Sequence, residues 1–313
     1  MPPDHPSTVA DLGTSPKVAA LVLNYNGLEV TLQTLESLSA MTYPNVDLVV
    51  VDNGSTDGSY EAVAERFPKV EQVRVAENRG ISYGMNHGLR WVLERDHDYV
   101  LILNNDIEVD PAMLTEMVAV AEGDPSRGAV GPKAYYYWDR ERIWSVGGIL
   151  RFRESVTTER GDQSLDRGQF DHDQEVDYVN GCAMLVRRAA LEATGLWDPT
   201  YYLGVEDADW CWRMKRQGFR CYYAHRARLW HMISHSTGVY KPGRTFHTGR
   251  STAIFVRRYA SFWQRLRFFA FMAVAFPAAW LRELPKGNQK AAVSKLRGVI
   301  EGWRVPLGDP PAA

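Results

Sequence analysis

Cysteine is scarce in this chain, and its spacing fits neither a disulfide framework nor a zinc ribbon. The 313 residues contain three cysteines, Cys182, Cys211 and Cys221, and no two of them form a C-x-x-C pair. An odd number at such spacing argues against both kinds of scaffold and favours a reducing compartment.

Several common motifs are missing as well. No G-x-G-x-x-G follows the first apolar run and no G-x-x-x-x-G-K-[ST] occurs, which excludes the dinucleotide fingerprint and the P-loop. Neither G-x-S-x-G nor H-E-x-x-H is present, which excludes the nucleophile elbow and the zinc-peptidase helix. Residues 1–16 lack a basic start and an apolar run, so they predict a loose, flexible tail rather than a signal peptide.

Net charge is also small, but it is unevenly placed. The formal charge of −2 gives no overall attraction to nucleic acid, and none is expected as a partner. From Tyr240 onward there are 13 basic and 3 acidic residues, so that segment carries +10 and residues 1–239 carry −12. Such a tail predicts either contact with something anionic or a helical appendage with a solvated basic face.

The basic end contains one apolar stretch, residues 268–280 (FFAFMAVAFPAAW), flanked by Arg265, Arg267 and Arg282. Its 13 residues fall short of the roughly 20 that a bilayer span needs. The pattern is typical of an amphipathic helix lying on an anionic bilayer. A core helix packed on the domain would look the same, so both interpretations stay open.

Short apolar runs alternate with helical patterns through the first half of the chain. Strands are predicted at 17–23, 46–52, 70–77 and 99–106, with helices between them. This alternation is typical of parallel βαβ units, so the fold class is α/β with helices on both faces of a mostly parallel sheet. Hairpins are expected over 138–177, followed by a strand over 177–188, a helix ending at Gly218 and a strand ending at His231. We expect a tail (1–16), a catalytic domain (17–238) and a basic, partly apolar helical extension (239–313).

Polar residues follow each predicted strand. Ligands of parallel sheets lie beyond the carboxyl ends of the strands, so these residues should meet at one edge. They are Asn24 and Asn26 after the first strand, Asp52 after the second, Asn78, Arg79 and Gly80 after the third, and Asn104, Asn105 and Asp106 at the fourth. Asp52 could bind a nucleotide or merely form a turn, and Asp106 could hold a cation or cap a helix. Gly80, Gly84 and Gly88 share a helix face, which indicates close approach of a ligand or of neighbouring backbone.

A second polar group lies later in the chain. Glu206, Asp207 and Asp209 crowd the start of a predicted helix, where negative charge is stabilised. Asp209 and Arg213 are spaced for a structural i,i+4 pair. Glu206 or Asp207 could be a general base. His231 could bind a metal, although a lone histidine is more often structural.

A series of segments then runs in order over about residues 17–238: LNYNG, VVVDNGSTDGS, ENRGISYGMNHG, ILNNDIEV, VNGCAMLVRR, GLWDPTYYLGVEDADWCWRMKRQG and LWHMISHS. Together they resemble the inverting family-2 glycosyltransferases, specifically the rhamnosyltransferase-like branch with the GT-A fold. One such segment would be weak, whereas the ordered set is highly specific.

The resemblance implies a role for each matching position. The residues implied to bind the nucleotide are Asn24, Tyr25, Asn26, Asp52, Asn78, Arg79, Gly80 and Asn105. Asp106 ends the D-x-D motif and would hold Mn²⁺ or Mg²⁺ on the diphosphate, with His231 as a further metal or diphosphate ligand. The first acid of that motif is Asn104 here, a departure that weakens a two-carboxylate grip. Asp207 would be the catalytic base, with Glu206 beside it.

The implied activity is transfer of a sugar from a UDP- or dTDP-linked donor to a hydroxyl group, with inversion, in bacterial cell-surface polysaccharide or glycoconjugate synthesis. The implied acceptor is a saccharide, a lipid-linked compound or another hydroxyl compound. A cytoplasmic enzyme, peripheral on the inner face of the membrane, would suit it.

Two rival functions fit the sequence less well. A sugar nucleotidyltransferase usually carries a basic, Gly-rich loop after its first strand, and NYNGLEVTLQ has no Lys or Arg. A nucleotide-sugar-binding module without transfer activity would not need Glu206, Asp207 and His231 in addition to Asp52 and Asp106.

Overall fold

The computed structural model describes residues 15–153, 155–233 and 240–313, so the predicted tail at 1–16 lies almost wholly outside the described residues. The strands are β1 Val18–Asn24, β2 Val46–Asp52, β3 Glu71–Arg74, β4 Tyr99–Asn104, β5 Ile107–Val109, β6 Arg127–Tyr136, β7 Asp139–Ser145, β8 Gly148–Leu150, β9 Thr157–Glu159, β10 Gln174–Val176, β11 Ala183–Arg187 and β12 Arg220–His231. The helices are α1 Leu28–Ser39, α2 Ser59–Arg66, α3 Ile81–Leu93, α4 Met113–Glu122, α5 Arg188–Thr194, α6 Glu206–Arg216, α7 Pro242–Tyr259, α8 Phe262–Glu283 and α9 Gln289–Arg304, with a short 3₁₀ turn at Leu284–Lys286.

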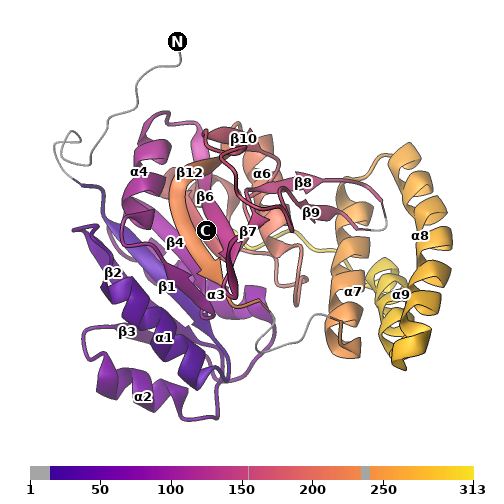
Figure 1. The fold of residues 1–313 in the computed structure, drawn as a ribbon, viewed down its shortest axis with the longest axis horizontal. Coiled ribbons are helices and arrows are strands. Elements are labelled where there is room, and N and C mark those ends of the chain that lie inside the picture. The colour runs from indigo at the N-terminus through magenta and orange to yellow at the C-terminus, as the bar shows by residue number, and fades with distance from the viewer. Residues whose placement is uncertain (1–14, 154, 234–239) are drawn as a thin grey trace.

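One mixed sheet forms the centre of the molecule (Figure 1). Its strand order is β10-β12-β6-β11-β4-β1-β2-β3, with β5 paired to β12 and β7 to β6. The half made of β3, β2, β1 and β4 is parallel, as the alternation of strands and helices predicted. Beyond β4 the chain reverses, because β11 runs antiparallel to both β4 and β6. This second half brings residues from after position 180 beside the ends of the parallel strands.

Helices cover both faces of the sheet, because side chains alternate along each strand. On β1, Val18, Ala20 and Val22 point to the face covered by α1, α2 and α4. Ala19 and Leu21 point to the other face, where α3, α5 and α6 pack. The α/β class with helices on both faces is therefore confirmed.

The glycines of α3 are explained by close packing of the helix on the sheet. A Cβ at Gly88 would lie 2.6 Å from the Val51 side chain, and one at Gly84 would lie 2.6 Å from the Asn53 side chain. Distances below about 3 Å are impossible without movement, so both positions need glycine. Of the two explanations that the spacing left open, neighbouring protein atoms account for these positions.

The segment 138–177 forms short strands, as predicted, and a buried cation fixes its far end. Lys133 is almost fully buried on β6, and its ammonium group contacts Asp166 at 2.8 Å and Asp171 at 2.6 Å. Tyr135 donates a further hydrogen bond to Asp166. A buried charge of this kind is stable only when it is paired. Moving the loop away would leave the Lys133 ammonium group without its carboxylate partners, so the pair holds the loop in place.

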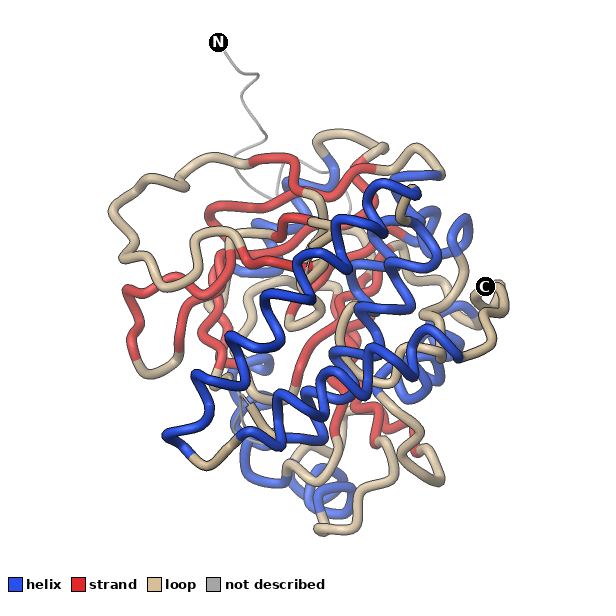
Figure 2. The backbone as a smooth tube through the Cα atoms, turned by 90° about the vertical axis from the view of Figure 1, so that its right-hand side faces the viewer, coloured by secondary structure: helices blue, strands red, loops and turns tan. Residues whose placement is uncertain are grey.

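The C-terminal residues form a layer of three helices against one side of the sheet domain, as Figure 2 shows face-on. Contact between α7 and α9 is close enough that a Cβ at Gly298 would lie 1.9 Å from the carbonyl oxygen of Phe246. The chain end returns to the sheet domain, where the Leu196 N–H donates to the carbonyl of Pro311 at 2.9 Å.

Two elements differ from their predicted extents. The strand expected from Asp177 begins only at Ala183, because residues 177–182 hydrogen-bond to β8, α6 and one another instead. The apolar helix spans 22 residues rather than 13, because Ser261 and Gln264 form a capping box ahead of the apolar run. By length and composition, Phe262–Lys286 is the one helical segment within the described ranges that could cross a membrane.

We predict that Gly298→Ala destabilises the protein by about 1–3 kcal/mol, because the new methyl group must push α7 and α9 apart. Gly243→Ala on α7 is the matched control, since a Cβ there meets nothing within 4 Å. It should be neutral or stabilising by up to about 1 kcal/mol. Urea unfolding of both variants measures the difference, and equal midpoints would contradict the close packing.

Candidate active site

The ends of β1 and β2 are joined by a buried polar network. The register places Asn24 directly beside Asp52. The Asn24 amide donates to Asp52 at 3.1 Å and lies within hydrogen-bond distance of the Ser55 and Ser59 hydroxyls. Asp52 also accepts from the Ser55 N–H at 3.1 Å. Asp52 is fully buried, so its carboxylate shapes the loop after β2 and has no exposed surface of its own.

The same asparagine reaches the end of β4. The Oδ1 atom of Asn24 accepts hydrogen bonds from Thr31 at 2.9 Å and from Asn105 at 3.1 Å. Exposed residues lie above this network: Tyr25 is 47% exposed, and Asn26 has φ of 49° and accepts a bond from the Thr56 N–H. The expected convergence of the strand-end residues is therefore present on this side of the sheet.

The residues after β3 lie at the same edge of the sheet, but their surroundings differ. Asn78 accepts a bond from the Gly80 N–H at 2.9 Å and lies 3.2 Å from the Asn53 amide nitrogen. Gly80 has φ of 104°, and a Cβ there would lie 2.8 Å from Tyr202, so only glycine fits. Arg79 is exposed and pairs with Glu77 at 3.0 Å.

Asp106 and His231 meet although 125 residues separate them. Antiparallel pairing of β12 with β5 places His231 opposite Ile107, and its Nε2 lies 3.1 Å from Asp106 Oδ1. Asn104 lies 3.4 Å from the same nitrogen, and the Trp144 ring packs edge-on against the imidazole at 4.6 Å. Both Asp106 and His231 are buried.

These residues fit a divalent cation only in part. A carboxylate and an imidazole are suitable donors, and the buried Nδ1 of His231 has no partner. No cluster of three or more His, Cys, Asp or Glu residues suited to a metal exists within the described ranges. A cation here would therefore need most of its ligands from a bound molecule, which is usual for Mg²⁺ held on phosphates.

Asp207 is tied to this site through backbone. Its Oδ2 accepts a hydrogen bond from the Gly181 N–H at 2.9 Å. The next residue, Cys182, accepts a bond through its carbonyl from the Asn104 N–H at 3.0 Å. Asp207 is thus linked to the end of β4 by a short path: one hydrogen bond to Gly181, the backbone of Gly181 and Cys182, and a second hydrogen bond from Asn104. Burial raises the pKa of Asp207 above its ordinary value.

Glu206 precedes it at a strained helix start. Val205 has φ of 75°, a region that a β-branched residue rarely adopts. The Glu206 side chain is buried, and its Oε2 has no hydrogen-bond partner. Burial, and then the charge of Asp207, raise the pKa of Glu206 to about 8. Asp209, by contrast, forms the expected pair with Arg213 at 2.9 Å and is structural.

Sequence reasoning missed two residues of this site. Glu159 is partly buried near Asp207 and accepts bonds from Ser145 at 2.5 Å and Tyr178 at 2.6 Å, and desolvation raises its pKa. It lies in a hairpin with no motif around it, so no local signal could have found it.

Arg244 is the second residue that was missed. The start of α7 packs on the loop before α6, where His247 stacks on Tyr202 with centroids 4.2 Å apart. One turn earlier, Arg244 is partly buried; burial lowers its pKa, whereas Asp106 and Glu206 act to raise it. The basic composition after Tyr240 was a signal, but it did not single out this arginine.

Comparison with known proteins identifies the family. Residues 20–195 match the family described as "Glycosyl transferase family 2". The chain belongs to that family and is a glycosyltransferase. It is 28% identical, over 74% of this chain and 81% of the relative, to N-acetylglucosaminyl-diphospho-decaprenol L-rhamnosyltransferase of Mycobacterium tuberculosis (strain CDC 1551 / Oshkosh). It is 25% identical to poly-beta-1,6-N-acetyl-D-glucosamine synthase of Staphylococcus aureus (strain COL), over 71% of this chain but 51% of that one.

Solved structures agree on the fold of this glycosyltransferase. The mannosyltransferase PcManGT of Pyrobaculum calidifontis, in complex with GDP-Man and Mn²⁺, superposes with a TM-score of 0.59 at 17% identity, covering 94% of this chain and 89% of that one. GalNAc-T7 with UDP, GalNAc and Mn²⁺ gives 0.60 at 13% identity, covering 77% and 48%. The GT-A fold is therefore confirmed.

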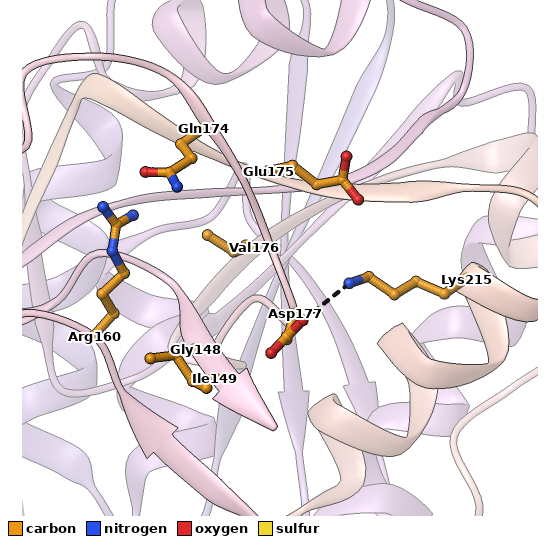
Figure 3. A pocket seen from close by; sticks show the side chains of 8 residues that line it. All are labelled: Gly148, Ile149, Arg160, Gln174, Glu175, Val176, Asp177 and Lys215. Atoms are coloured by element: carbon orange, nitrogen blue, oxygen red, sulfur yellow. Dashed lines mark hydrogen bonds and ion pairs between the residues drawn. The ribbon is translucent and has the colours of Figure 1, made fainter. Parts of the chain in front are cut away.

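The glycosyltransferase has a further hollow of about 360 Å³ beside the hairpin, shown in Figure 3. Lys215 reaches across it toward Asp177, 3.4 Å away, while Arg160 lies on the opposite side. Glu175 adds a second carboxylate, so the charges of its lining balance. This hollow lies toward the C-terminal end of α6, away from Asp207 at its start.

We predict that Glu206 gives the enzyme a measurable pH dependence of stability. The folded state keeps this carboxyl protonated up to about pH 8, whereas the unfolded chain ionises it from about pH 4.5. The folded state therefore binds more protons in that window, and stability falls as pH rises through it.

Glu206→Gln removes this contribution, so its melting temperature should rise relative to wild type between pH 5 and pH 8. Calorimetry at several pH values measures the gap. Glu29→Gln, an exposed change on α1, is the control and should follow wild type. If the difference in melting temperature between Glu206→Gln and wild type were the same at every pH, the raised pKa of Glu206 would be contradicted.

Proposed function

We propose that this glycosyltransferase moves a sugar from a UDP- or dTDP-linked donor to an acceptor hydroxyl, with inversion at the anomeric carbon. The observation that carries the proposal is the short backbone path from Asp207 through Gly181 and Cys182 to Asn104, next to Asp106. It holds a basic carboxylate and a phosphate-binding end in fixed relation, as one-step displacement requires.

The nucleoside belongs at the ends of β1 and β2 in this proposal. Tyr25, Asn26 and Arg79 are exposed there, and Asn78 and Gly80 follow the neighbouring strand β3. Because Asp52 is fully buried, we assign it a positioning role: it holds Ser55 and Asn24 in place rather than offering an open carboxylate.

The diphosphate belongs beside Asp106. Asp106 and His231 would hold Mn²⁺ or Mg²⁺ together with donor phosphate oxygens, and the cation would stabilise the charge of the departing nucleoside diphosphate. The Mn²⁺ named with two structural neighbours supports this choice. Arg244, which interacts electrostatically with Asp106 and Glu206, is the basic residue that we assign to the diphosphate.

Asp207 removes the acceptor proton in the proposed reaction. The acceptor oxygen bonds to the anomeric carbon, the bond to the diphosphate oxygen breaks, and the hydroxyl proton passes to Asp207. The raised pKa of Asp207 brings it closer to neutral pH, which favours a general base. Glu206, protonated below about pH 8, can donate a hydrogen bond to acceptor or donor oxygens.

The relatives support a bacterial cell-surface role. One of them acts, by its name, on a diphospho-decaprenol-linked sugar, so a lipid-linked acceptor is the favoured class. We place residues 17–238 as the catalytic domain and 239–313 as an extension that rests on the inner face of the membrane, in the cytoplasm. The exposed apolar surface of α8 supports that contact, with Trp263 74% and Val274 70% exposed.

Asp207→Asn should retain donor binding and lose nearly all transfer, because the amide has the same shape but cannot accept the proton. A general base contributes about 10²–10⁴-fold to the rate, which is the expected loss. Release of nucleoside diphosphate measures turnover, and thermal shift measures donor binding. Asp177→Asn, at the hollow of Figure 3, is the control; wild-type turnover by Asp207→Asn would remove that residue from its role.

A thermal-shift panel of nucleoside diphosphates and their sugars tests the donor site. We expect a UDP or dTDP compound to stabilise the protein most, and more strongly with Mn²⁺ than without. Asp52→Ala should weaken that nucleotide's affinity by calorimetry, because the loop loses its anchor. Asp106→Asn should lose the metal enhancement but keep nucleotide binding, which separates the two halves of the site. Unchanged nucleotide affinity in Asp52→Ala would contradict its place beside the nucleoside.

A further inference from the structure

Glu159 is a partly buried carboxylate that no step of the proposed reaction uses. The register of the β8–β9 hairpin pairs it with Gly148, and the Gly148 N–H donates to the carbonyl of Tyr178 at 2.9 Å. The Tyr178 ring covers that glycine so closely that a Cβ at Gly148 would lie 1.9 Å from the ring. The base of the hairpin is therefore packed tightly on the segment that follows Asp177, and Glu159 is held there with it.

Both oxygens of Glu159 accept hydrogen bonds. Oε2 accepts from the hydroxyl of Ser145, at the end of β7, at 2.5 Å. Oε1 accepts from the Tyr178 hydroxyl at 2.6 Å and from the Asn180 side-chain nitrogen at 3.1 Å. Three donors around one carboxylate leave it little freedom to rotate, so Glu159 forms a rigid connection between β7 and Asn180.

Asn180 carries this restraint to the base of the proposed reaction. Its side-chain oxygen accepts from the Cys182 N–H at 2.9 Å, which closes a tight turn. Gly181, in the middle of that turn, donates its N–H to Asp207 Oδ2 at 2.9 Å. The other oxygen of Asp207 accepts from Ala208 at 2.7 Å within its own helix, whereas the turn connects the carboxylate to a separate element.

We propose that Glu159 is a positioning residue for Asp207: it anchors Asn180 and thereby aims the Gly181 N–H at the carboxylate that takes the acceptor proton. This rests on the role proposed above for Asp207. Glu159 acts through the turn and needs no contact with substrate. Such a residue still matters for the rate, because misplacing a reacting group by about 1 Å can cost about 100-fold.

The amide proton of Gly181 gives a direct test, because its NMR resonance reports the hydrogen bond to Asp207. Asp207→Asn shows how the resonance moves when the carboxylate is replaced. Glu159→Ala should move it in the same direction, because Asn180 loses its anchor. Glu159→Gln should leave it near the wild-type position, since a glutamine oxygen still accepts from Asn180. An unchanged Gly181 resonance in Glu159→Ala would overturn the proposal.

Turnover tests the consequence for the reaction. The donor is the UDP- or dTDP-linked sugar that stabilises wild type most, the acceptor is water, and release of nucleoside diphosphate is measured. Glu159→Ala should lower kcat about 10–100-fold at an unchanged donor KM. Glu159→Gln should restore most of the rate, which a proton-transfer role for Glu159 itself would not allow. Equal losses in the two variants would assign proton transfer to Glu159 and overturn the positioning role.

Tyr178→Phe is the matched control. It removes one donor to Glu159 but keeps the ring on Gly148 and the connection from Ser145 through Glu159 to Asn180. Both the Gly181 resonance and kcat should therefore stay close to wild type. A loss as large as that of Glu159→Ala would trace the effect to general disturbance of the hairpin and overturn the assignment.

Asn180→Ala removes the middle of the connection without changing Glu159, and it should reproduce the effects of Glu159→Ala. It keeps the proposal testable if Glu159→Ala does not fold. The two proposals fail separately. Full turnover by Asp207→Asn would remove Asp207 as the base but leave the Gly181 measurements standing, whereas an unmoved Gly181 resonance in both alanine variants would remove Glu159 alone.

Discussion

The buried side-chain amide of Asn24 holds together the polar edge on which this enzyme depends. Its nitrogen reaches the loop after β2 through Asp52 and Ser55, and its oxygen reaches α1 and the end of β4 through Thr31 and Asn105. Such a residue is costly to bury unless every polar atom is satisfied, and here both are. The exposed residues nearby keep their positions because this network lies beneath them.

The acids of the site are crowded and buried, which sets their chemistry. Glu206, Asp207 and Glu159 all have raised pKa values, and burial is the largest cause for each. The strained Val205 backbone and the open Oε2 of Glu206 are costs that a purely structural helix start would avoid. The raised pKa values of Glu206 and Asp207 at the start of α6 support the proposed proton transfer to Asp207.

The C-terminal helices pack against the helix that carries Asp207. Tyr259 of α7 donates to Asp209 at 2.7 Å, and Arg258 pairs with Asp198 at 2.6 Å, so α7 fixes the helix that carries Asp207. Arg244 of the same helix interacts electrostatically with Asp106 and Glu206. The layer that offers an apolar face to the outside therefore also supports the site inside.

Local sequence determined a large part of this protein. The apolar runs and turn residues specified the parallel strands, and topology alone then placed Asn24, Asp52 and Asp106 at one edge. The spacing of Asp209 and Arg213 specified their ion pair, and the ordered segments specified the family.

The local pattern could not specify the contacts between elements that the folded sheet brings together. His231 meets Asp106 because β12 pairs with β5, Glu159 lies near Asp207 because a hairpin folds back, and Arg244 reaches the acids because α7 packs on the loop before α6. Periodicity and spacing report on neighbours along the chain, whereas strand register and helix docking are decided by burial among residues that lie from tens to more than a hundred positions apart.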